Sequence, residues 1–523
     1  MGTVIGLFVK KQRPERTKAW RYRDFWGTGK REELVESLAE PEFDNQYHTA
    51  LPERANQFNF RPSKVSADYY AWPSLTDLIR TEPSNGLMEK RGSSLISIDS
   101  PPLKARMQRY FDRSVSWESL AALGTGLTED AAGYDARKTR TKAQREESYS
   151  DDRVVPYAAR PFDHQSAYYS EVSPLWNRSR PALYAQLWAG NSYFVSRRHG
   201  SKSTEGPPFY WTSRLFDDSL LSLHATAFPI RVRSVNRSLA GFDEAQSHQR
   251  ATNNYSDDVI AYLQEIGIEP ENDEETASLL WLHCLAIGFA PKYLQVNADG
   301  IKQDWPRIPL PRNAELLRAS AKLGKRLAAL LDADQVPGIT KAPLRPEIQF
   351  IGRLRRSSGE AFDPTDDLEI DQGWGRPQQG GVFPGLGRVV IRDYTDDEVD
   401  SIERGGAGLG MKREKLLELI GEQTCDVYLN AETFWSNVPE NVWNYHLGGY
   451  QVIKKWLSYR ETRILGRPIT PDEAREVQGM ARRLLGVLLM QPDLNENYRK
   501  NEHTWSRWPP ARASPKRRGQ GHT

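Results

Sequence analysis

Apolar residues recur at helical spacing in several stretches of the chain, most clearly in its second half. Segment 274–287 repeats them densely enough to predict a helix with a broad apolar face, and segment 313–331 spaces its leucines in the same way. Thr470-Pro471-Asp472-Glu473 predicts a helix start, because a capping hydroxyl precedes proline and acids in the first turn; that helix extends to about Met490. Shorter helices are predicted over 30–38, from the Pro101–Pro102 pair onward, over 256–267 and over 412–421.

Short β-branched or aromatic runs between these helices predict strands. They cover residues 3–9, 19–23, 95–98, 388–394 and 426–429. Between residues 153 and 235, aromatic-rich runs are punctuated by Pro and Gly, which indicates a mainly β region. Segment 373–387 is rich in Pro and Gly and predicts turns. Separate helical and β-rich regions, without an internal repeat, predict an α+β fold.

The composition indicates a folded protein from a reducing compartment. Hydrophobic residues make up 38% and aromatic residues 10% of the 523 residues, so the chain can bury a core. Two cysteines, Cys284 and Cys425, are too few for a disulfide scaffold or a Cys-rich zinc site. No apolar run is long enough to cross a membrane, and the first residues lack the order of a signal peptide. We therefore expect a cytoplasmic protein.

Positive charge gathers at the two ends of the chain, although the net charge is only +2. Residues 1–31 hold nine Lys or Arg against two acids, and the last 19 residues hold five Lys or Arg and no acid. We expect residues 501–523 to form a disordered basic tail. Such patches suit a polyanionic partner, whereas ordinary solvated surface charge accounts for the composition equally well.

Familiar catalytic patterns are absent from the sequence. It contains no Gly-x-x-x-x-Gly-Lys-Ser/Thr loop, no Gly-x-Ser-x-Gly elbow, no His cluster at metal-ligand spacing and no Asn-Pro-Pro-aromatic turn for methylating a flipped base. The run Gly405–Gly410 follows acidic residues rather than a strand, so we interpret it as a flexible loop. Glu369 and Asp371 are interpreted as surface carboxylates. No catalytic or metal-binding residue is therefore assigned.

Basic, amide and aromatic side chains interleaved with turns form a first candidate DNA-binding cluster. Arginine suits guanine and asparagine suits adenine in the major groove, and both also bind phosphate. As an alternative, Arg160 and Asp163 pair with each other and hold a turn. The candidate contacts are Arg160, Arg178, Arg180, Asn191, Arg197 and Arg198.

A second candidate cluster surrounds Gly448-Gly449. The glycines permit positive φ and close backbone approach, and a helix starting at Tyr450 would present its N-terminus beside lysines, which suits a DNA phosphate. Trp443 and Trp456 are interpreted as core residues, and His446 as a packing residue. The candidate contacts are Gln451, Lys454, Lys455 and Arg460.

Three ordered motifs resemble the C-terminal specificity domain of type ISP restriction–modification enzymes. The first is Arg160-Pro161-Phe162-Asp163 with Tyr168-Tyr169, and the second is Trp305-Pro306-Arg307-Ile308-Pro309-Leu310, followed by a helix that contains Gly324. The third comprises Asp426–Asn430, Asn437–Pro439, Val442-Trp443, Leu447–Val452 and Lys455–Leu457. The resemblance covers about residues 150 to 490, and its strongest block is Gly448-Gly449-Tyr450-Gln451.

The resemblance implies a division of the chain. Residues 1–40 resemble the closing strands of the methyltransferase domain in the same family, and residues 41–150 would connect them, with mixed α/β structure, to the rest. A target-recognition domain over residues 151–500 would combine a β-rich DNA-recognition region with a helical C-terminal support, ahead of the tail at 501–523.

The resemblance also implies a function. The chain would bind duplex DNA at a specific sequence and position the methyltransferase and nuclease of an upstream portion of the same phage-defence system. S-adenosylmethionine, ATP and Mg serve the missing upstream domains of that family, so no cofactor is expected in this chain. Two alternatives stay open. The chain is the C-terminal half of an active adenine-N6 DNA methyltransferase completed by a separately encoded part, or a stand-alone protein tethered to nucleic acid by its basic tail.

Overall fold

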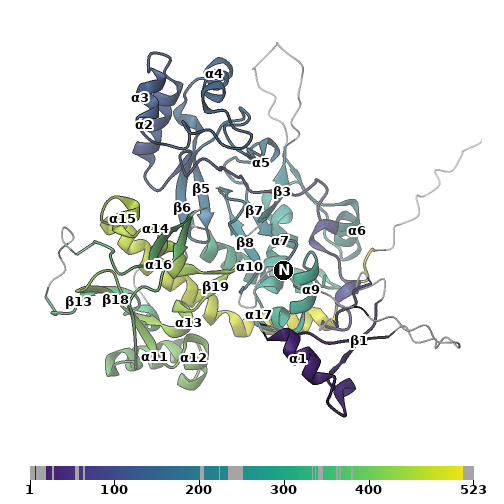
Figure 1. Cartoon of the computed structure of the whole chain (residues 1–523). Helices are drawn as coiled ribbons and strands as arrows, with labels where there is room; N and C mark the ends of the chain where they lie inside the picture. Colours follow the sequence, from purple (N-terminus) through teal and green to yellow (C-terminus); the bar gives the residue numbers. More distant parts are fainter. Residues whose placement is uncertain are drawn as a thin grey trace, which may run out of the picture.

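The computed structural model describes most of the chain, and its architecture is shown in Figure 1. The described residues are 6, 19–25, 27, 29–52, 58–62, 65–200, 205–222, 224–233, 251–332, 334–335, 337, 339, 345–360, 363, 367–378 and 381–510. The strand predicted over residues 3–9 lies outside them, apart from Gly6, as do residues 511–523 of the tail.

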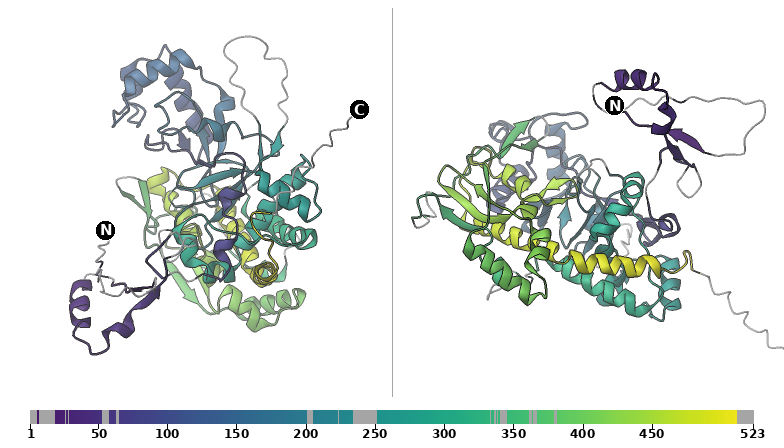
Figure 2. Two further views of the ribbon diagram at one scale, coloured as in Figure 1. Left: turned by 90° about the vertical axis from the view of Figure 1, so that its right-hand side faces the viewer. Right: turned by 90° about the horizontal axis from the view of Figure 1, so that it is seen from below.

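A small β–α–β unit comes first along the chain. Strand β1 (Trp20–Tyr22) pairs antiparallel with β2 (His48–Ala50), and helix α1 (Lys30–Ser37) lies between them in sequence. The strand predicted over 19–23 and the helix predicted over 30–38 are thus confirmed. Both views of Figure 2 place this unit at the periphery, apart from the main body.

A helical lobe stands at one end of the molecule, at the top of Figure 1. It contains α2 (Ser100–Phe111), α3 (Trp117–Ala121) and α4 (Ala136–Glu146). Arg140 of α4 joins this helix to the end of α2, because its guanidinium donates hydrogen bonds to the carbonyl oxygens of Tyr110 and Asp112, at 2.9 and 2.8 Å. The basic helix α4 is therefore packed rather than free.

The strands of the β-rich region predicted between residues 153 and 235 lie in two four-stranded sheets, each of which also takes one strand from earlier in the chain, β3 or β4. The first has the order β4-β6-β5-β9, and the second has the order β3-β10-β7-β8. Only β5 and β9 pair in parallel among the strands of these two sheets. The strands are β3 (Ser84–Asn85), β4 (Ile96–Ser97), β5 (Val154–Arg160), β6 (Asp163–Tyr168), β7 (Tyr193–Ser196), β8 (Phe209–Thr212), β9 (Leu215–Phe216) and β10 (Thr226–Pro229). The short helix α5 (Pro181–Tyr184) and the pair β11 (Arg231–Val232) and β12 (Thr252–Asn253) flank them.

Helices α6 to α10 follow, and α7 packs on the second sheet. The ring of Trp281 in α7 lies 5.5 Å from the rings of both Phe194 and Phe228. Helices α7 and α10 are in close contact, since a Cβ added at Gly324 would lie 1.9 Å from the Leu282 carbonyl oxygen. The bounds are α6 (Asp257–Glu265), α7 (Glu274–Gly288), α8 (Pro291–Val296), α9 (Ala298–Gln303) and α10 (Ala314–Leu331).

A third four-stranded sheet, in the order β13-β18-β17-β16, begins the C-terminal part. Its strands are β13 (Arg353–Arg356), β16 (Val389–Arg392), β17 (Thr424–Tyr428) and β18 (Thr433–Pro439). Two hairpins stand beside it: β14 (Gly375–Gln378) with β15 (Gly381–Pro384), and β19 (His446–Leu447) with β20 (Tyr450–Gln451). The helices are α11 (Asp396–Gly408), α12 (Arg413–Ile420), α13 (Glu440–Trp443), α14 (Val452–Tyr459), α15 (Thr462–Leu465), α16 (Pro471–Leu489) and α17 (Gln491–His503). The α+β prediction is confirmed.

The interpretation of Gly405–Gly410 as a flexible loop is wrong. Helix α11 runs through Gly408, and it starts with a capping box in which Thr395 and Glu398 exchange hydrogen bonds. A Cβ added at Gly405 would lie 2.4 Å from Cβ of Glu347, so the glycine allows the helix to pack closely. Sequence reasoning noted only that the residues before the glycines were acidic and did not form a strand, whereas Asp396, Asp397 and Glu398 form the first turn of the helix.

The predicted disordered tail is also wrong at its start. Residues up to His503 complete α17, and Asn501 is fully buried, with its amide donating to the Asn497 carbonyl oxygen at 2.7 Å. Trp505 then forms a bridge with Pro311. Packing against other segments of the same chain thus orders residues whose polar composition suggests disorder.

Replacing Gly324 with alanine is expected to lower the free energy of unfolding by roughly 1–3 kcal/mol, because the added methyl meets the Leu282 backbone. Gly479 in α16 provides the matched control, since a Cβ there meets nothing within 4 Å. Gly479→Ala should stabilise the protein by about 0.5–1 kcal/mol through helix propensity. Chemical denaturation measures both. Effects of the same sign would contradict the close contact of α7 and α10.

A second prediction concerns acid sensitivity and His283, which is fully buried in α7. Its Nε2 lies 2.9 Å from the Pro309 carbonyl oxygen and its Nδ1 2.8 Å from the Ser320 hydroxyl. Burial lowers the pKa of His283 to about 4. Between pH 6.5 and 4, His283 is protonated in the unfolded state but stays neutral in the folded state. The free energy of unfolding therefore falls as the pH falls.

Replacing His283 with glutamine should flatten this pH dependence. The shift corresponds to about 3 kcal/mol, with the loss beginning as the pH falls below 6.5. Melting temperatures measured between pH 7 and pH 5 check the prediction before most carboxylates titrate. An unchanged slope in the His283→Gln variant would show that other groups control acid sensitivity.

Candidate nucleic-acid interface

The alternative interpretation of the first cluster, in which Arg160 pairs with Asp163, is wrong, because each of these residues forms an ion pair with a different partner. Arg160 does not bind Asp163; its Nη1 lies 3.0 Å from Oδ1 of Asp217. Asp163 instead accepts a hydrogen bond from Nη1 of Arg460 at 2.8 Å, and both side chains are 1% exposed. Arg160 and Asp163 are register partners where β5 turns into β6, but each reaches toward a residue distant in sequence.

Arg460 lies at the centre of a buried network of charges. Its Nε is 3.7 Å from Oε1 of Glu473, and its guanidinium stacks 3.8 Å from the ring of Trp456. Glu473 also binds Nη1 of Arg467 at 2.7 Å, and Arg467 reaches Asp99 at 2.6 Å. Hydrogen bonds to Asp99 and Glu473 raise the pKa of Arg467. Arg460 therefore lies within the protein, away from any surface that duplex DNA reaches.

Asn191 and Arg197 are buried as well, at 4% and 2% exposure. The Asn191 amide donates to the carbonyl oxygens of Gln186 and Arg231, and its oxygen accepts from the backbone N–H of Arg231. Arg197 binds Glu205 and donates to the Leu221 carbonyl oxygen at 3.0 Å. These side chains hold the loops around the second sheet.

Gly448 and Gly449 have positive φ values, 55° and 93°, which glycine permits. Their amides, however, do not face solvent. Gly448 donates its N–H to Pro207, and Gly449 donates to Glu205, at 3.0 and 2.8 Å. Helix α14 begins at Val452 and not at Tyr450, because β20 occupies Tyr450–Gln451. The turn is thus a contact with the β-rich region, and its amides are not available to a phosphate.

The candidates at the end of β20 and on α14 differ in their surroundings. Lys455 is 7% exposed and donates from Nζ to the Val382 carbonyl oxygen of β15 at 2.8 Å. Gln451 donates to the Trp443 carbonyl oxygen at 2.9 Å. Lys454 is half-buried, and this burial lowers its pKa. Trp443 and Trp456 are buried, as predicted.

The remaining candidates lie at or near the surface. Arg178 is exposed and Arg180 is half-buried, with its Nε 3.4 Å from the Gly86 carbonyl oxygen. Arg198 is 59% exposed and pairs with Asp304 at 2.9 Å. Of the ten predicted contacts, Arg178, Arg180, Arg198 and Lys454 thus remain accessible to a partner without disruption of a buried hydrogen bond or ion pair.

Sequence reasoning missed one exposed element, the β14–β15 hairpin within the segment predicted as turns. Strands of four residues in a Pro- and Gly-rich segment lack the alternation that identifies a hairpin. One signal was present: no Asp or Glu occurs between Gln372 and Arg392.

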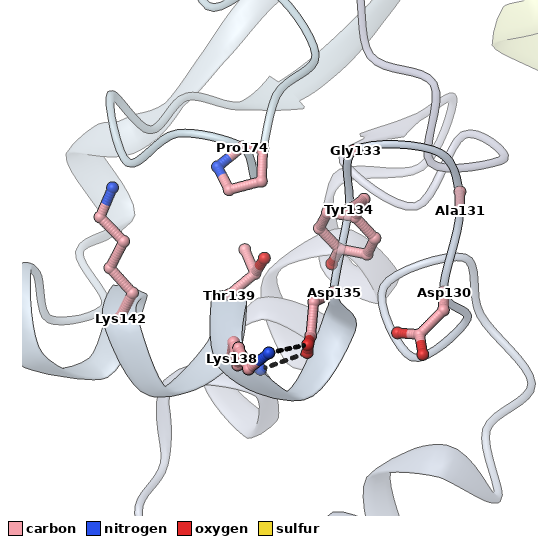
Figure 3. Close-up of a pocket in the computed structure, with 9 residues that line it drawn as sticks. All are labelled: Asp130, Ala131, Gly133, Tyr134, Asp135, Lys138, Thr139, Lys142 and Pro174. Carbon is pink, nitrogen blue, oxygen red and sulfur yellow. Dashed lines mark hydrogen bonds and ion pairs between the residues drawn. The ribbon is translucent and has the colours of Figure 1, made fainter.

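A surface depression of about 500 Å³ lies on the helical lobe (Figure 3). Lys138 and Asp135 at its rim pair with each other at 2.9 Å, and Lys142 donates to the Ser173 carbonyl oxygen. Asp130 and Thr139 line it without forming a nucleophile–base pair. Among the residues described, no three His, Cys, Asp or Glu side chains gather to hold a metal ion. Within the same residues, no helix has the length and apolar character to span a membrane.

Comparison with known proteins identifies similar folds. A family model described as the type ISP C-terminal specificity domain matches residues 79–484. The structure of the DrdV–DNA complex covers 89% of this chain at 16% identity, with a TM-score of 0.51. A nuclease-deletion mutant of the type ISP restriction–modification enzyme LlaGI, in complex with a DNA substrate mimic, covers 89% at 13% identity, with a TM-score of 0.50.

The ATP-dependent type ISP enzyme LlaBIII bound to DNA covers 87% of this chain at 15% identity, with a TM-score of 0.49. The chain spans 25% of the length of LlaBIII, 37% of the LlaGI mutant and 42% of DrdV. A comparison with curated proteins gives no match. The DrdV and LlaGI likenesses, at these identities, show a shared fold.

Breaking the Asp163–Arg460 pair on one side is expected to cost about 3–5 kcal/mol of stability, because it leaves a buried charge without its partner. Asp163→Asn tests this by chemical denaturation. Replacing both residues, as Asp163→Leu with Arg460→Met, should recover much of the loss. Arg475→Ala, which removes one partner of an exposed ion pair, is the control and should leave the melting temperature unchanged. A small effect of Asp163→Asn would show that the network is not needed for folding.

Proposed function

Because the chain belongs, over residues 79–484, to the family of type ISP C-terminal specificity domains, we propose that it recognises a short sequence of duplex DNA. It would act as the target-selecting portion of a type ISP restriction–modification enzyme. The match to the family model carries this proposal. The DrdV and LlaGI structures support it, since they share the fold over 89% of the chain and are complexes with DNA or a DNA mimic.

The glycine-rich run of α11 has a structural role. The glycine-rich run that most resembles a cofactor loop lies at the end of α11 and packs on Glu347, so it does not form the strand–loop–helix turn that a nucleotide cofactor requires. We infer that S-adenosylmethionine, ATP and Mg would be bound by another portion of the same system. The chain would contribute the choice of sequence and the placement of that portion on DNA.

The β1–α1–β2 unit is the surface we propose for contact with the upstream portion. Large apolar side chains of this unit and of the segment just after it are exposed, and a gathering of such groups marks an interaction surface. They are Val35, Leu38, Leu51, Phe58 and Phe60, with exposures from 52% to 61%. The second candidate function rests on the same surface: the chain would complete an adenine-N6 methyltransferase whose catalytic half is encoded separately. Methyl transfer to DNA by the mixed portions, and by neither alone, favours that candidate.

DNA contacts would divide into two classes. Phosphate contacts position a protein on the duplex, and contacts to base edges select the sequence. Arg178, Arg180, Arg198 and Lys454 are accessible cations and are proposed as contacts to the DNA backbone. Counterion release at such contacts would make affinity fall as salt rises.

Selection from a randomised duplex pool tests the function. The whole chain, with the upstream portion supplied, is expected to enrich one short motif. Specific binding should exceed binding to random duplex by roughly 10³-fold or more. A pool without an enriched motif under these conditions would contradict the proposed function.

Two adjacent lysines provide matched variants for the same assay. Lys454→Ala should weaken binding to every duplex alike and reduce the slope of log affinity against log salt by about 0.9, without lowering the melting temperature. Lys455→Ala should lower the melting temperature, because Nζ holds the Val382 carbonyl oxygen. The reverse pattern would show that the phosphate contact has been assigned to the wrong lysine.

A further inference from the structure

The β14–β15 hairpin has a firmly held base. The carboxylate of Glu461, which is 2% exposed, accepts hydrogen bonds from the backbone N–H groups of Gly373 and Trp374 at 2.9 and 2.6 Å. Trp374 is fully buried, and its ring meets that of Trp443 edge-on at 5.6 Å. A buried anion with several backbone donors fixes the path of the chain where it enters the hairpin.

Both strands are also held from α14 and the segment that follows it. Lys455 donates to the Val382 carbonyl oxygen of β15, and Nη2 of Arg463 donates to the Gly375 carbonyl oxygen of β14, each at 2.8 Å. A Cβ at Gly375 would lie 2.1 Å from the Ser458 carbonyl oxygen, so β14 runs directly against α14. The hairpin is thus a supported ribbon with one side on the protein.

The exposed face of this ribbon carries Arg376, Gln378 and Phe383. Arg376 and Gln378 are two residues apart on β14, and Phe383 is the register partner of Arg376, so the three side chains lie on one face. Arg376 and Gln378 are exposed, and no hydrogen bond or ion pair from the described residues reaches either side chain. Phe383 is 49% exposed, and Leu386, just beyond the hairpin, is 78% exposed.

The charge around the ribbon fits an anionic partner. No Asp or Glu occurs from Gln372 to Arg392, and Arg388 adds a cation stacked 3.9 Å from the ring of Tyr428. A two-stranded ribbon fits the major groove of B-DNA, where arginine binds guanine, glutamine binds adenine and apolar groups contact the thymine methyl. The supported base meets a further need of sequence readout, which is that the reading side chains stand on a rigid element.

We propose that the β14–β15 hairpin enters the major groove of the target duplex, with Arg376 and Gln378 reading base edges. Arg376 binds the O6 and N7 atoms of a guanine, and Gln378 binds an adenine. Phe383 supplies an apolar surface beside them. This assignment rests on the proposed DNA-recognition function and names the element that performs it.

The test compares the motifs that wild-type and variant chains select from a randomised duplex pool, with the upstream portion present. Arg376→Ala should weaken binding to the preferred site by roughly 5- to 150-fold, leave binding to random duplex nearly unchanged and remove the preference for guanine at one position. Gln378→Ala should remove the preference for adenine at another position. Arg326→Ala on α10, whose side chain is 57% exposed, is the control for loss of one surface charge and should leave the selected motif unchanged.

The outcomes separate the two proposals. If the wild-type chain selects no motif, the proposed function fails. If the wild-type chain selects a motif that both hairpin variants retain, the hairpin assignment fails and the function stands. An equal loss of affinity of Arg376→Ala for all duplexes identifies a phosphate contact and overturns base reading by Arg376. Melting temperatures equal to that of the wild type confirm that the variants are folded, as the exposure of both side chains predicts.

Discussion

The buried guanidinium of Arg460 joins regions of the chain that are far apart in sequence. It pairs with Asp163 on β6 and approaches Glu473 on α16, and Arg467 links Glu473 to Asp99 at the start of α2. Charges at 1% exposure are stable only when each finds its partner, because the interior does not solvate them. The helical lobe, the first sheet and the C-terminal helices are therefore held in one relative position.

The three motifs that resemble the specificity domain lie where the parts of the molecule meet. Asp163 in the first motif binds Arg460, and the glycines of the third donate to Pro207 and Glu205. In the second, Pro306 accepts a hydrogen bond from the backbone of Leu75. A Cβ at Gly206 would lie 1.7 Å from the His446 carbonyl oxygen, so the β-rich region and the C-terminal part approach backbone to backbone. Asp163, Pro306, Gly448 and Gly449 of these motifs thus make contacts within the protein.

The side chains that stabilise the fold are different from those proposed to read the DNA bases. Arg460 directly follows α14, and Lys455 of α14 supports the β14–β15 hairpin. The side chains that hold the scaffold are buried and paired, whereas those proposed to read the bases stand exposed on a short ribbon. Changes on the exposed face of such a ribbon leave the interior contacts intact, which would allow sequence preference to vary while the fold is kept.

The sequence alone determined the element types where local signals are strong. Helix α16 begins at the predicted capping box, and α7 and α10 follow their apolar periodicity, because both signals depend on residues within one or two turns. The burial of Trp443 and Trp456 was likewise predictable. The family was evident from motif order.

Only the tertiary structure decided which charged side chains face inward. Arg160 and Arg460 look like DNA contacts in sequence, yet their partners, Asp217 and Asp163, are set by the packing of separate segments. Arg197 is buried against Glu205. The Asp163–Arg460 pair spans 297 residues, a separation that no local pattern encodes. Tertiary packing also gives Gly405 its role, since the missing side chain lets α11 pack against Glu347 of another segment. The role of an arginine or a glycine depends on the residues that the folded chain places next to it, and these are determined by the sequence as a whole.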